Sequence, residues 1–238
     1  MSKVLVIPDV HLKPWIFDQA AEIMINTDCD RAVCVGDLVD DWGFEDNVAI
    51  YEETLKKAIS FAERFPDTIW CYGNHDLSYL WDQYDHPGYS SAAKERVIEL
   101  FMELQDSLES PDQIGIIHRL DNVLFSHAGL SIEFIDTQLS DMADDVDCMI
   151  DTINEYGVEE LWENNSPIWI RPQYGNLAKG MYSEGLLQVV GHTPVKEALY
   201  QENVLTLDTF STTSTLRPIG NQELYWVDTE TKEWGMIS

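Results

Sequence analysis

Short apolar runs rich in Val, Ile and aromatic residues recur along the 238-residue chain, and they limit its possible folds more than any other feature. Runs of this length and composition predict strands, several of them buried on both faces. Helical patterns separate the early runs, and the order strand, helix, strand is typical of βαβ units. The runs span 3–8, 31–35, 68–72, 114–117, 123–126, 186–190, 203–207 and 223–227, with helical patterns over 16–26, 47–64 and 90–108. The chain is therefore expected to adopt an α/β fold.

Two further segments have patterns of their own. After residue 200 the strand patterns follow one another without helices, which predicts an antiparallel finish to a sheet with a hairpin turn at 228–234. Residues 120–170 contain no Lys or Arg, while their apolar residues keep a helical spacing. This acidic segment is expected to form one or two amphipathic helices, whose outer face is either simply solvated or a surface for a basic partner.

Composition bears on the core and on the class of partner. With 45% hydrophobic and 11% aromatic residues, residues 1–238 are expected to form a single domain with a substantial core. The 43 acidic and 14 basic residues give a formal net charge of −29. This balance argues against a nucleic-acid partner, because phosphate backbones are bound by clustered Lys and Arg. It suits a protein that binds cations or basic partners.

Cysteine usage and hydropathy bear on the compartment. Cys29, Cys34, Cys71 and Cys148 show no CxxC spacing, so buried free thiols in a reducing compartment are expected. No run approaches the ~18 apolar residues of a membrane span, and the first run is too short for a signal peptide. A cytoplasmic protein without a membrane partner is expected, and its oligomeric state is open.

Five of the apolar runs deliver Asp, Asn or His at the point where they end. In α/β sheets, ligands bind in the crevice outside the carboxyl ends of the strands. Carboxylates and imidazoles crowded into a dry crevice would repel each other or stay unsatisfied, and divalent cations resolve that conflict. Ligand sets of mixed oxygen and nitrogen suit manganese, iron, zinc and similar ions. The residues are Asp9 and His11, Asp37, Asn74 with His75 and Asp76, His127, and His192; of the remaining histidines, His86 is expected in a loop and His118 at a strand end or on the surface.

The same positions carry a resemblance to a known family. The motifs DVH, GDLVD, GNHD, SHAG and GHTP, in this order over residues 9–194, resemble the five signature blocks of the calcineurin-like metallophosphoesterases. Among its branches, the chain is most similar to the serine/threonine protein phosphatases and dinucleoside-polyphosphate hydrolases. The resemblance implies a four-layer α/β/β/α metallophosphoesterase sandwich with the metal site at the C-terminal ends of the strands. Substrate specificity is expected to come from insertions at about 77–113 and 130–185.

The resemblance also implies a role for each motif residue. Two divalent metal ions are expected, with manganese first and iron, zinc, nickel, cobalt or magnesium as alternatives. His75 would be the general acid for the leaving oxygen, and Asp40 would orient and charge it. The ligands would be Asp9 and His11 for the first metal, Asp37 as the bridge, and Asn74, His127 and His192 for the second.

Several positions depart from the family pattern. Pro194 stands where many phosphodiesterases of the superfamily have a second histidine, in GHxH. Asp41 stands where the phosphatase branch has a phosphate-binding Arg, and an acid there would repel a phosphate. Arg171 is the best substitute candidate for substrate binding, ahead of Arg217; the alternative is that Arg171 only pairs with the acidic segment. Four other positions differ from that branch: Leu12, Trp42 and Phe210 each stand where the branch has Gly, and Asp76 stands where it has Glu.

The resemblance implies a two-metal-dependent phosphoesterase that hydrolyses phosphomonoester or phosphoanhydride bonds through a metal-bound hydroxide. Its substrate would be a phosphorylated small molecule or a phosphoprotein. One alternative is a phosphodiesterase or nuclease acting on nucleotides or nucleic acid, against which Pro194 and the scarcity of basic residues count. Another is a scaffold without activity, against which the complete ligand set counts. The aromatic residues Tyr79, Trp81, Tyr84 and Tyr89 either stack on a base or, the preferred interpretation, pack in the core.

Overall fold

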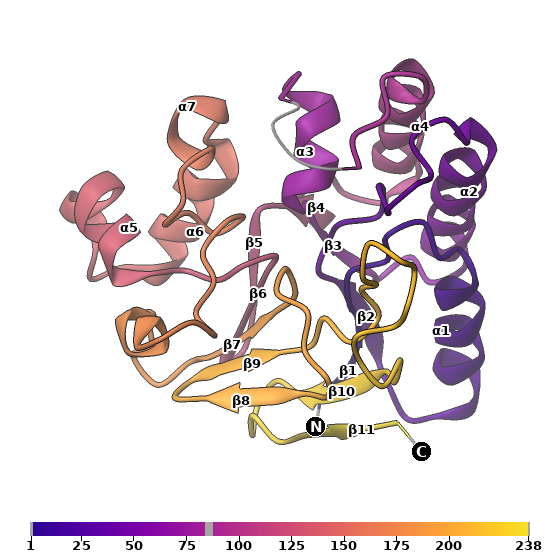
Figure 1. Cartoon of the computed structure of the whole chain (residues 1–238). Coiled ribbons are helices and arrows are strands. Elements are labelled where there is room, and N and C mark those ends of the chain that lie inside the picture. The colour runs from indigo at the N-terminus through magenta and orange to yellow at the C-terminus, as the bar shows by residue number, and fades with distance from the viewer. Residues whose placement is uncertain (1, 84–87, 238) are drawn as a thin grey trace.

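Two mixed β-sheets form the centre of the computed structural model, which describes residues 2–83 and 88–237. They lie face to face with helices on both outer sides (Figure 1). Within the described residues, the first sheet has the order β11 (Trp234–Met236), β10 (Tyr225–Asp228), β1 (Lys3–Ile7), β2 (Arg31–Cys34), β3 (Ile69–Cys71) and β4 (Ile114–Gly115). The second has the order β5 (Ile117–Leu120), β6 (Val123–Ser126), β7 (Leu187–Val190), β9 (Val204–Thr206) and β8 (Leu199–Gln201).

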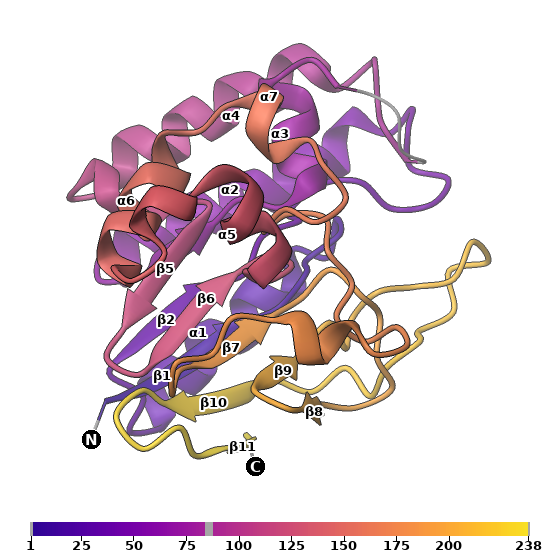
Figure 2. The ribbon, with the colours of Figure 1, turned by 90° about the vertical axis from the view of Figure 1, so that its left-hand side faces the viewer.

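Helices cover the outer face of each sheet. The first sheet is covered by α1 (Trp15–Asn26), α2 (Val48–Arg64) and α4 (Lys94–Ser107), and the second by α5 (Ile132–Gln138) and α6 (Val146–Glu155). Viewed from the side of α5 and α6, these helices lie in front of β5 and β6 (Figure 2). Shorter helices are α3 (Asn74–Leu80), α7 (Val158–Leu161) and the 3₁₀ turns η1 (Pro111–Gln113), η2 (Ser140–Met142) and η3 (Leu177–Gly180).

The period of two along each strand separates the core into layers. Val4 and Val6 of β1 pack in the cluster between the two sheets, while Leu5 and Ile7 pack in the cluster beneath the helices. Fully burying one such side chain contributes about 1.5–3 kcal/mol, so both faces of the central strands stabilise the fold. The expected four-layer α/β/β/α sandwich, with strands buried on both faces, is confirmed.

The run at 114–117 is the main difference from the expected strands, because it divides between the two sheets. Asn154 of α6 causes the division: its Oδ1 accepts from the backbone N–H of Ile116 at 2.7 Å and of Ile117 at 3.1 Å. These side-chain bonds replace ladder bonds, so β4 ends in the first sheet and β5 begins in the second.

The tail after residue 200 is only partly antiparallel. The strands β10 and β11 pair antiparallel around the expected turn, and β10 pairs antiparallel with β1. By contrast, β9 pairs parallel with β7, because the additional strand β8 forms a hairpin with β9 and returns the chain in the direction of β7. The strand β11 completes the expected hairpin, while β8, also of three residues, was not expected from the sequence.

The acidic segment folds as expected into amphipathic helices, with Met149 and Ile153 of α6 buried. Of the cysteines, Cys34 and Cys71 are buried free thiols. Contrary to expectation, Cys29 is only half-buried, and Cys148 is exposed because it lies on the outer face of α6. Tyr79 and Tyr89 stack with centroids 4.5 Å apart, which confirms packing for these two. Tyr84 and His86 lie outside the described residues. Among the described helices, none has both the length and the apolar character that a membrane crossing requires.

His118 is buried in β5 rather than exposed, with 9% of its surface accessible, and its Nε2–H donates to the Trp70 carbonyl at 2.9 Å. Burial lowers its pKa to about 4 from 6.5. Between these values only the unfolded chain takes up the proton, so the free energy of unfolding should fall by up to about 3 kcal/mol as the pH drops from 6.5 to 4.

His118→Gln removes this titration. Urea unfolding at a series of pH values should therefore show a shallower decline between pH 6.5 and 4 for the variant than for the wild type. The carboxylates titrate in both proteins, so the difference isolates His118. Parallel curves would contradict the assignment.

Candidate metal centre

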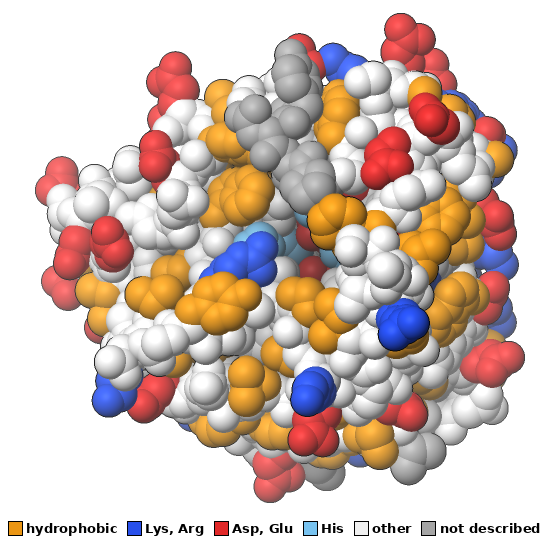
Figure 3. Space-filling model, viewed as in Figure 1, with side chains coloured by type: hydrophobic (Ala, Val, Ile, Leu, Met, Phe, Trp, Pro, Cys, Tyr) orange, Lys and Arg blue, Asp and Glu red, His pale blue; other side chains and the backbone are white. Residues whose placement is uncertain are grey.

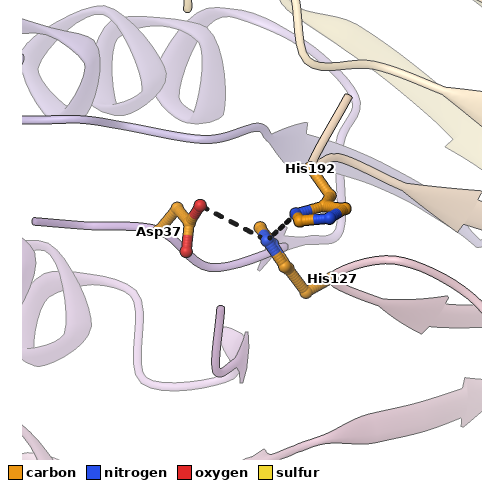
Figure 4. A group of neighbouring side chains, drawn as sticks. All are labelled: Asp37, His127 and His192. Carbon is orange, nitrogen blue, oxygen red and sulfur yellow. Dashed lines mark hydrogen bonds and ion pairs between the residues drawn. The ribbon is translucent and has the colours of Figure 1, made fainter. Parts of the chain in front are cut away.

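The polar residues predicted from the sequence converge at one edge of the two sheets. Asp9, Asp37 and Asn74 follow β1, β2 and β3 of the first sheet, while His127 and His192 follow β6 and β7 of the second. These strands are parallel within their sheets, so their carboxyl ends open toward the same crevice. Asp37, His127 and His192 point toward one another (Figure 4).

The first group of candidate ligands consists of Asp9, His11 and Asp37. One ligand atom from each lies within 4.8 Å of the others. His11 Nε2 is 3.9 Å from Asp9 Oδ2 and 3.7 Å from Asp37 Oδ2. Two carboxylates and one imidazole are a donor set that suits a divalent cation such as manganese.

The second group consists of Asp37, His127 and His192. His127 Nε2 lies 3.3 Å from Asp37 Oδ2, 3.0 Å from His192 Nδ1 and 2.9 Å from Asn74 Oδ1. The amide oxygen of Asn74 thus joins this group, and the Oδ2 atom of Asp37 faces both groups. That position is the one a bridging ligand would occupy.

Backbone carbonyls set the orientation of all three imidazole rings. His11 donates its Nδ1–H to the Asp40 carbonyl at 2.8 Å, and His127 donates its Nδ1–H to the Val35 carbonyl at 2.9 Å. His192 donates its Nε2–H to the Trp169 carbonyl at 3.1 Å. The opposite nitrogen of each ring therefore faces the ligand groups, which is the arrangement that second-shell contacts impose on metal-binding histidines.

The electrostatics of the crevice fit cation binding. Burial lowers the pKa of His11 and of His192, so both rings are neutral and offer lone pairs. Burial also opposes charge on His127, but Asp37 and Asp9 outweigh it and raise the pKa of His127 to about 9. In the metal-free chain a proton on His127 compensates the buried carboxylates, at the place where a cation would otherwise do so.

The backbone at two glycines lies very close to the carboxylates of Asp37 and Asp9. A Cβ atom added at Gly73 would lie 2.0 Å from Asp37 Oδ1, and one at Gly191 would lie 1.8 Å from Asp9 Oδ1. Only glycine permits these approaches. His11, Asp37 and His192 have positive φ values of 44°, 49° and 64°, a conformation that non-glycine residues adopt at a cost. Such strain gathers at functional sites, where the surrounding structure enforces it.

Asp76 ties two of the ligand loops together, a role that the sequence did not indicate. It is buried, and its Oδ1 accepts from the Leu38 N–H at 2.8 Å while its Oδ2 accepts from the Gly73 N–H at 2.9 Å. The loop after β2 is thereby fixed to the start of α3. The available signal was an Asp three residues after Gly73, the spacing of a reciprocal helix cap.

His75 and Asp40 lie beside the ligand groups. His75 Nδ1 is 3.0 Å from Asp40 Oδ2, and the backbone N–H of His75 donates to Asp37 Oδ1 at 3.0 Å. Burial opposes the charged ring, but Asp37 and Asp40 together raise the pKa of His75 above its usual value. The expected pairing of these two side chains is thus present, and its role in catalysis stays a prediction.

A cleft of about 460 Å³ opens over the candidate ligands. Figure 3 shows this hollow, with histidine and acidic side chains at its base and hydrophobic side chains around it. Its lining includes His11, Asp37, Asn74, His75, His192, Asp40, Asp41, Trp42, Trp169, Arg171, Pro194, Ile219 and the hydroxyl residues Ser211–Ser214.

Arg171 lies in the wall of the cleft. Its Nη1 donates to the His192 carbonyl at 2.9 Å and to Thr193 Oγ1 at 3.2 Å. Within residues 2–83 and 88–237 it forms no ion pair with a carboxylate, so pairing with the acidic segment is wrong for that part of the chain. Arg217 is exposed and does not line the cleft. Substrate binding by Arg171 stays a prediction.

Asp41 also lines the cleft, but its charge is compensated. Lys13 Nζ lies 2.9 Å from its Oδ2, while Thr212 Oγ1 and the Trp42 N–H donate to its Oδ1 at 2.7 and 2.8 Å. Burial raises the pKa of Asp41, but Lys13, with the hydrogen bonds from Thr212 and the Trp42 N–H, outweighs that effect and lowers the pKa below its usual value. The expected repulsion of phosphate is therefore offset by Lys13, and Asp41 instead anchors the 211–214 loop over the cleft.

Asp37→Asn should reduce manganese affinity by more than about a hundredfold, since even outer-shell partners of metal ligands are worth 10–100-fold. Calorimetric titration and metal analysis after dialysis would measure this loss. Asp40→Asn is the matched control, because Asp40 lies in the same loop and is equally buried. Its oxygens bond His75, Tyr51 and Tyr79 rather than face the ligand groups. Equal losses in both variants would refute the bridging position of Asp37.

Comparison with known proteins identifies the family of the chain. The family model of the calcineurin-like phosphoesterases matches residues 2–213, while no curated protein matches significantly. The chain is similar to a metallophosphoesterase from Sphaerobacter thermophilus (TM-score 0.50, 12% identity, covering 99% of this chain and 88% of that one). It is also similar to a hypothetical protein from Pyrococcus horikoshii (0.54, 12%, 100% and 88%) and to an archaeal phosphodiesterase (0.44, 17%, 99% and 98%). The chain belongs to the calcineurin-like phosphoesterases, hydrolases of phosphoester bonds that depend on divalent metal ions.

Proposed function

We propose that the protein is a two-metal-dependent phosphatase that hydrolyses phosphomonoester or phosphoanhydride bonds. The observation that carries the proposal is the His75–Asp40 pair beside two groups of candidate ligands that share Asp37. Asp9, His11 and Asp37 would hold one cation, and Asp37, Asn74, His127 and His192 the other. Two such cations neutralise phosphoryl charge and lower the pKa of bound water.

His75 is the proposed general acid. Asp40 engages its Nδ1, and His75 lines the cleft, so Nε2 is the atom that would donate to a substrate there. The raised pKa of His75 favours the imidazolium, which can give its Nε2 proton to the leaving oxygen as the bond to phosphorus breaks.

Arg171 is the proposed phosphate-binding residue. A guanidinium carries five N–H donors in a planar fork, and the contacts of Arg171 with His192 and Thr193 use Nη1 alone. These contacts fix the fork at the wall of the cleft. The remaining donors suit the non-bridging oxygens of a phosphoryl group, which Arg binds in a bidentate manner.

The two proposed cations and Arg171 should stabilise the charge of a dianionic monoester more than that of a monoanionic diester. The manganese-loaded protein is expected to hydrolyse p-nitrophenyl phosphate with a higher kcat/KM than bis-p-nitrophenyl phosphate. A preference for the diester would favour the phosphodiesterase alternative, and turnover of neither would favour a scaffold. Phosphopeptides and dinucleoside polyphosphates, assayed side by side, would then separate the phosphoprotein and small-molecule substrate classes.

Arg171→Ala should raise KM for the monoester about ten- to a hundredfold, the effect of losing a charged hydrogen bond, and should erode the preference for monoester over diester. Arg217→Ala is the matched control, because Arg217 is exposed and outside the cleft lining. If Arg171→Ala keeps wild-type kinetics on both esters, Arg171 does not bind substrate.

His75→Asn should lower kcat about 10²–10⁴-fold on phenyl phosphate, whose leaving group needs a proton. The loss should be smaller on p-nitrophenyl phosphate, because nitrophenolate leaves readily without protonation. Steady-state kinetics on the two substrates, with metal content measured in parallel, would check this. An equal loss on both would rule out the general-acid role.

A further inference from the structure

Asp40 lies in a network of buried hydroxyl groups that the family motifs do not predict. It is 1% exposed, and among the described residues its Oδ1 accepts hydrogen bonds from Tyr51 Oη at 3.0 Å and Tyr79 Oη at 2.5 Å. Its Oδ2 faces His75 Nδ1 at 3.0 Å. The two oxygens of one carboxylate therefore have separate partners: the tyrosines hold Oδ1, and His75 engages Oδ2.

The two tyrosines come from different elements and are themselves fixed. Tyr51 belongs to α2 and is 0% exposed; Tyr79 belongs to α3 and is 1% exposed. Tyr79 Oη accepts from the Ser90 N–H at 2.8 Å, and its ring stacks on Tyr89. Tyr51 Oη also lies 3.2 Å from the Gly88 carbonyl. Two rigid donors from separate helices thus converge on one oxygen atom.

Tyr79 and His75 are four residues apart on α3, so they lie on the same face of the helix. Asp40 spans between them, with one oxygen toward each. The rotation of its carboxylate therefore sets the direction of the His75 ring. Burial raises the pKa of both tyrosine hydroxyls, so both stay protonated and can only be donors toward the carboxylate. Hydrogen bonds to a buried charged group are the stronger ones in proteins.

We propose that Tyr51 and Tyr79 are positioning residues that hold Asp40 in the orientation that aims His75 at the leaving oxygen. Neither lines the cleft, so neither touches substrate. The inference rests on the proposed function, because it concerns the general-acid step. It deepens that function by assigning the control of His75 to α2 and to the second turn of α3, outside the signature motifs.

Tyr79→Phe and Tyr51→Phe remove one hydroxyl each and keep the ring. Each should lower kcat on phenyl phosphate about tenfold, the effect of one hydrogen bond to a charged group, with KM and manganese content unchanged. On p-nitrophenyl phosphate the loss should be at most about threefold, because that leaving group needs little help from the acid. If Tyr79→Phe does not fold, Tyr51→Phe carries the test alone.

A double-mutant cycle with His75→Asn provides the sharper measurement. If the tyrosines act through His75, adding Tyr79→Phe or Tyr51→Phe to His75→Asn should lower kcat no further. Tyr72→Phe is the matched control, since Tyr72 is a buried tyrosine whose hydroxyl bonds Gln105 and not Asp40. It should keep the wild-type dependence on the leaving group.

The outcomes separate the two proposals. In the first case the wild type is active, but the tyrosine variants lose no kcat, lose kcat equally on both substrates, or show losses that add to that of His75→Asn. Any of these results overturns the positioning role and leaves the proposed function standing. A manganese-loaded wild type that hydrolyses no phosphoester overturns the proposed function and the inference with it. Losses that depend on the leaving group and vanish in the His75→Asn background support the inference.

Discussion

The carboxylate of Asp37 is the contact on which the rest of the site depends. Its Oδ1 accepts from the His75 N–H, and its Oδ2 faces His11 at 3.7 Å and His127 at 3.3 Å. Its own carbonyl accepts from the N–H groups of Val10 and His11 at 3.0 and 2.8 Å. One residue thus joins the loops after β1, β2 and β3 and reaches the second sheet through His127. A buried anion in this position is tolerable only because cationic or proton-bearing partners surround it.

The sandwich explains why these groups can be held so close together. Parallel strands at the centre of both sheets are buried on each face, and Asp9, Asp37 and His127 follow within three residues of the ends of β1, β2 and β6. The backbone carbonyls of Val35, Asp40 and Trp169 then accept one N–H from each imidazole, which fixes the direction of the other nitrogen. Each candidate histidine ligand and the carbonyl that orients it therefore come from different loops, so the packing of several loops against one another sets the geometry of the site.

The walls of the cleft differ from the family pattern at the position where a phosphate-binding Arg would be expected. Asp41 is paired with Lys13 and bonded to Thr212, so this corner supports the 211–214 loop and carries little net charge. Arg171 enters the cleft from the opposite end of the chain, held by the backbone after β7. In the proposed function, Arg171 would therefore take the part in substrate binding that the resemblance assigns to an Arg at position 41.

The sequence by itself determined where most strands and helices lie and which residues are candidate ligands. Periods of two and 3.6 identify strands and helices locally, and the rule that ligands gather at strand ends brings Asp9, Asp37 and His192 together without knowledge of distances. Tertiary structure decided everything that depends on contacts between remote segments. Asn154 of α6 divides the 114–117 run between two sheets, and Thr212 reaches Asp41 across 171 positions. Tyr51 and Tyr79 meet on one oxygen of Asp40 because α2 and α3 both pack against α4. No local pattern encodes such a meeting, because a tyrosine on a buried helix face reads as core until its hydroxyl finds a partner.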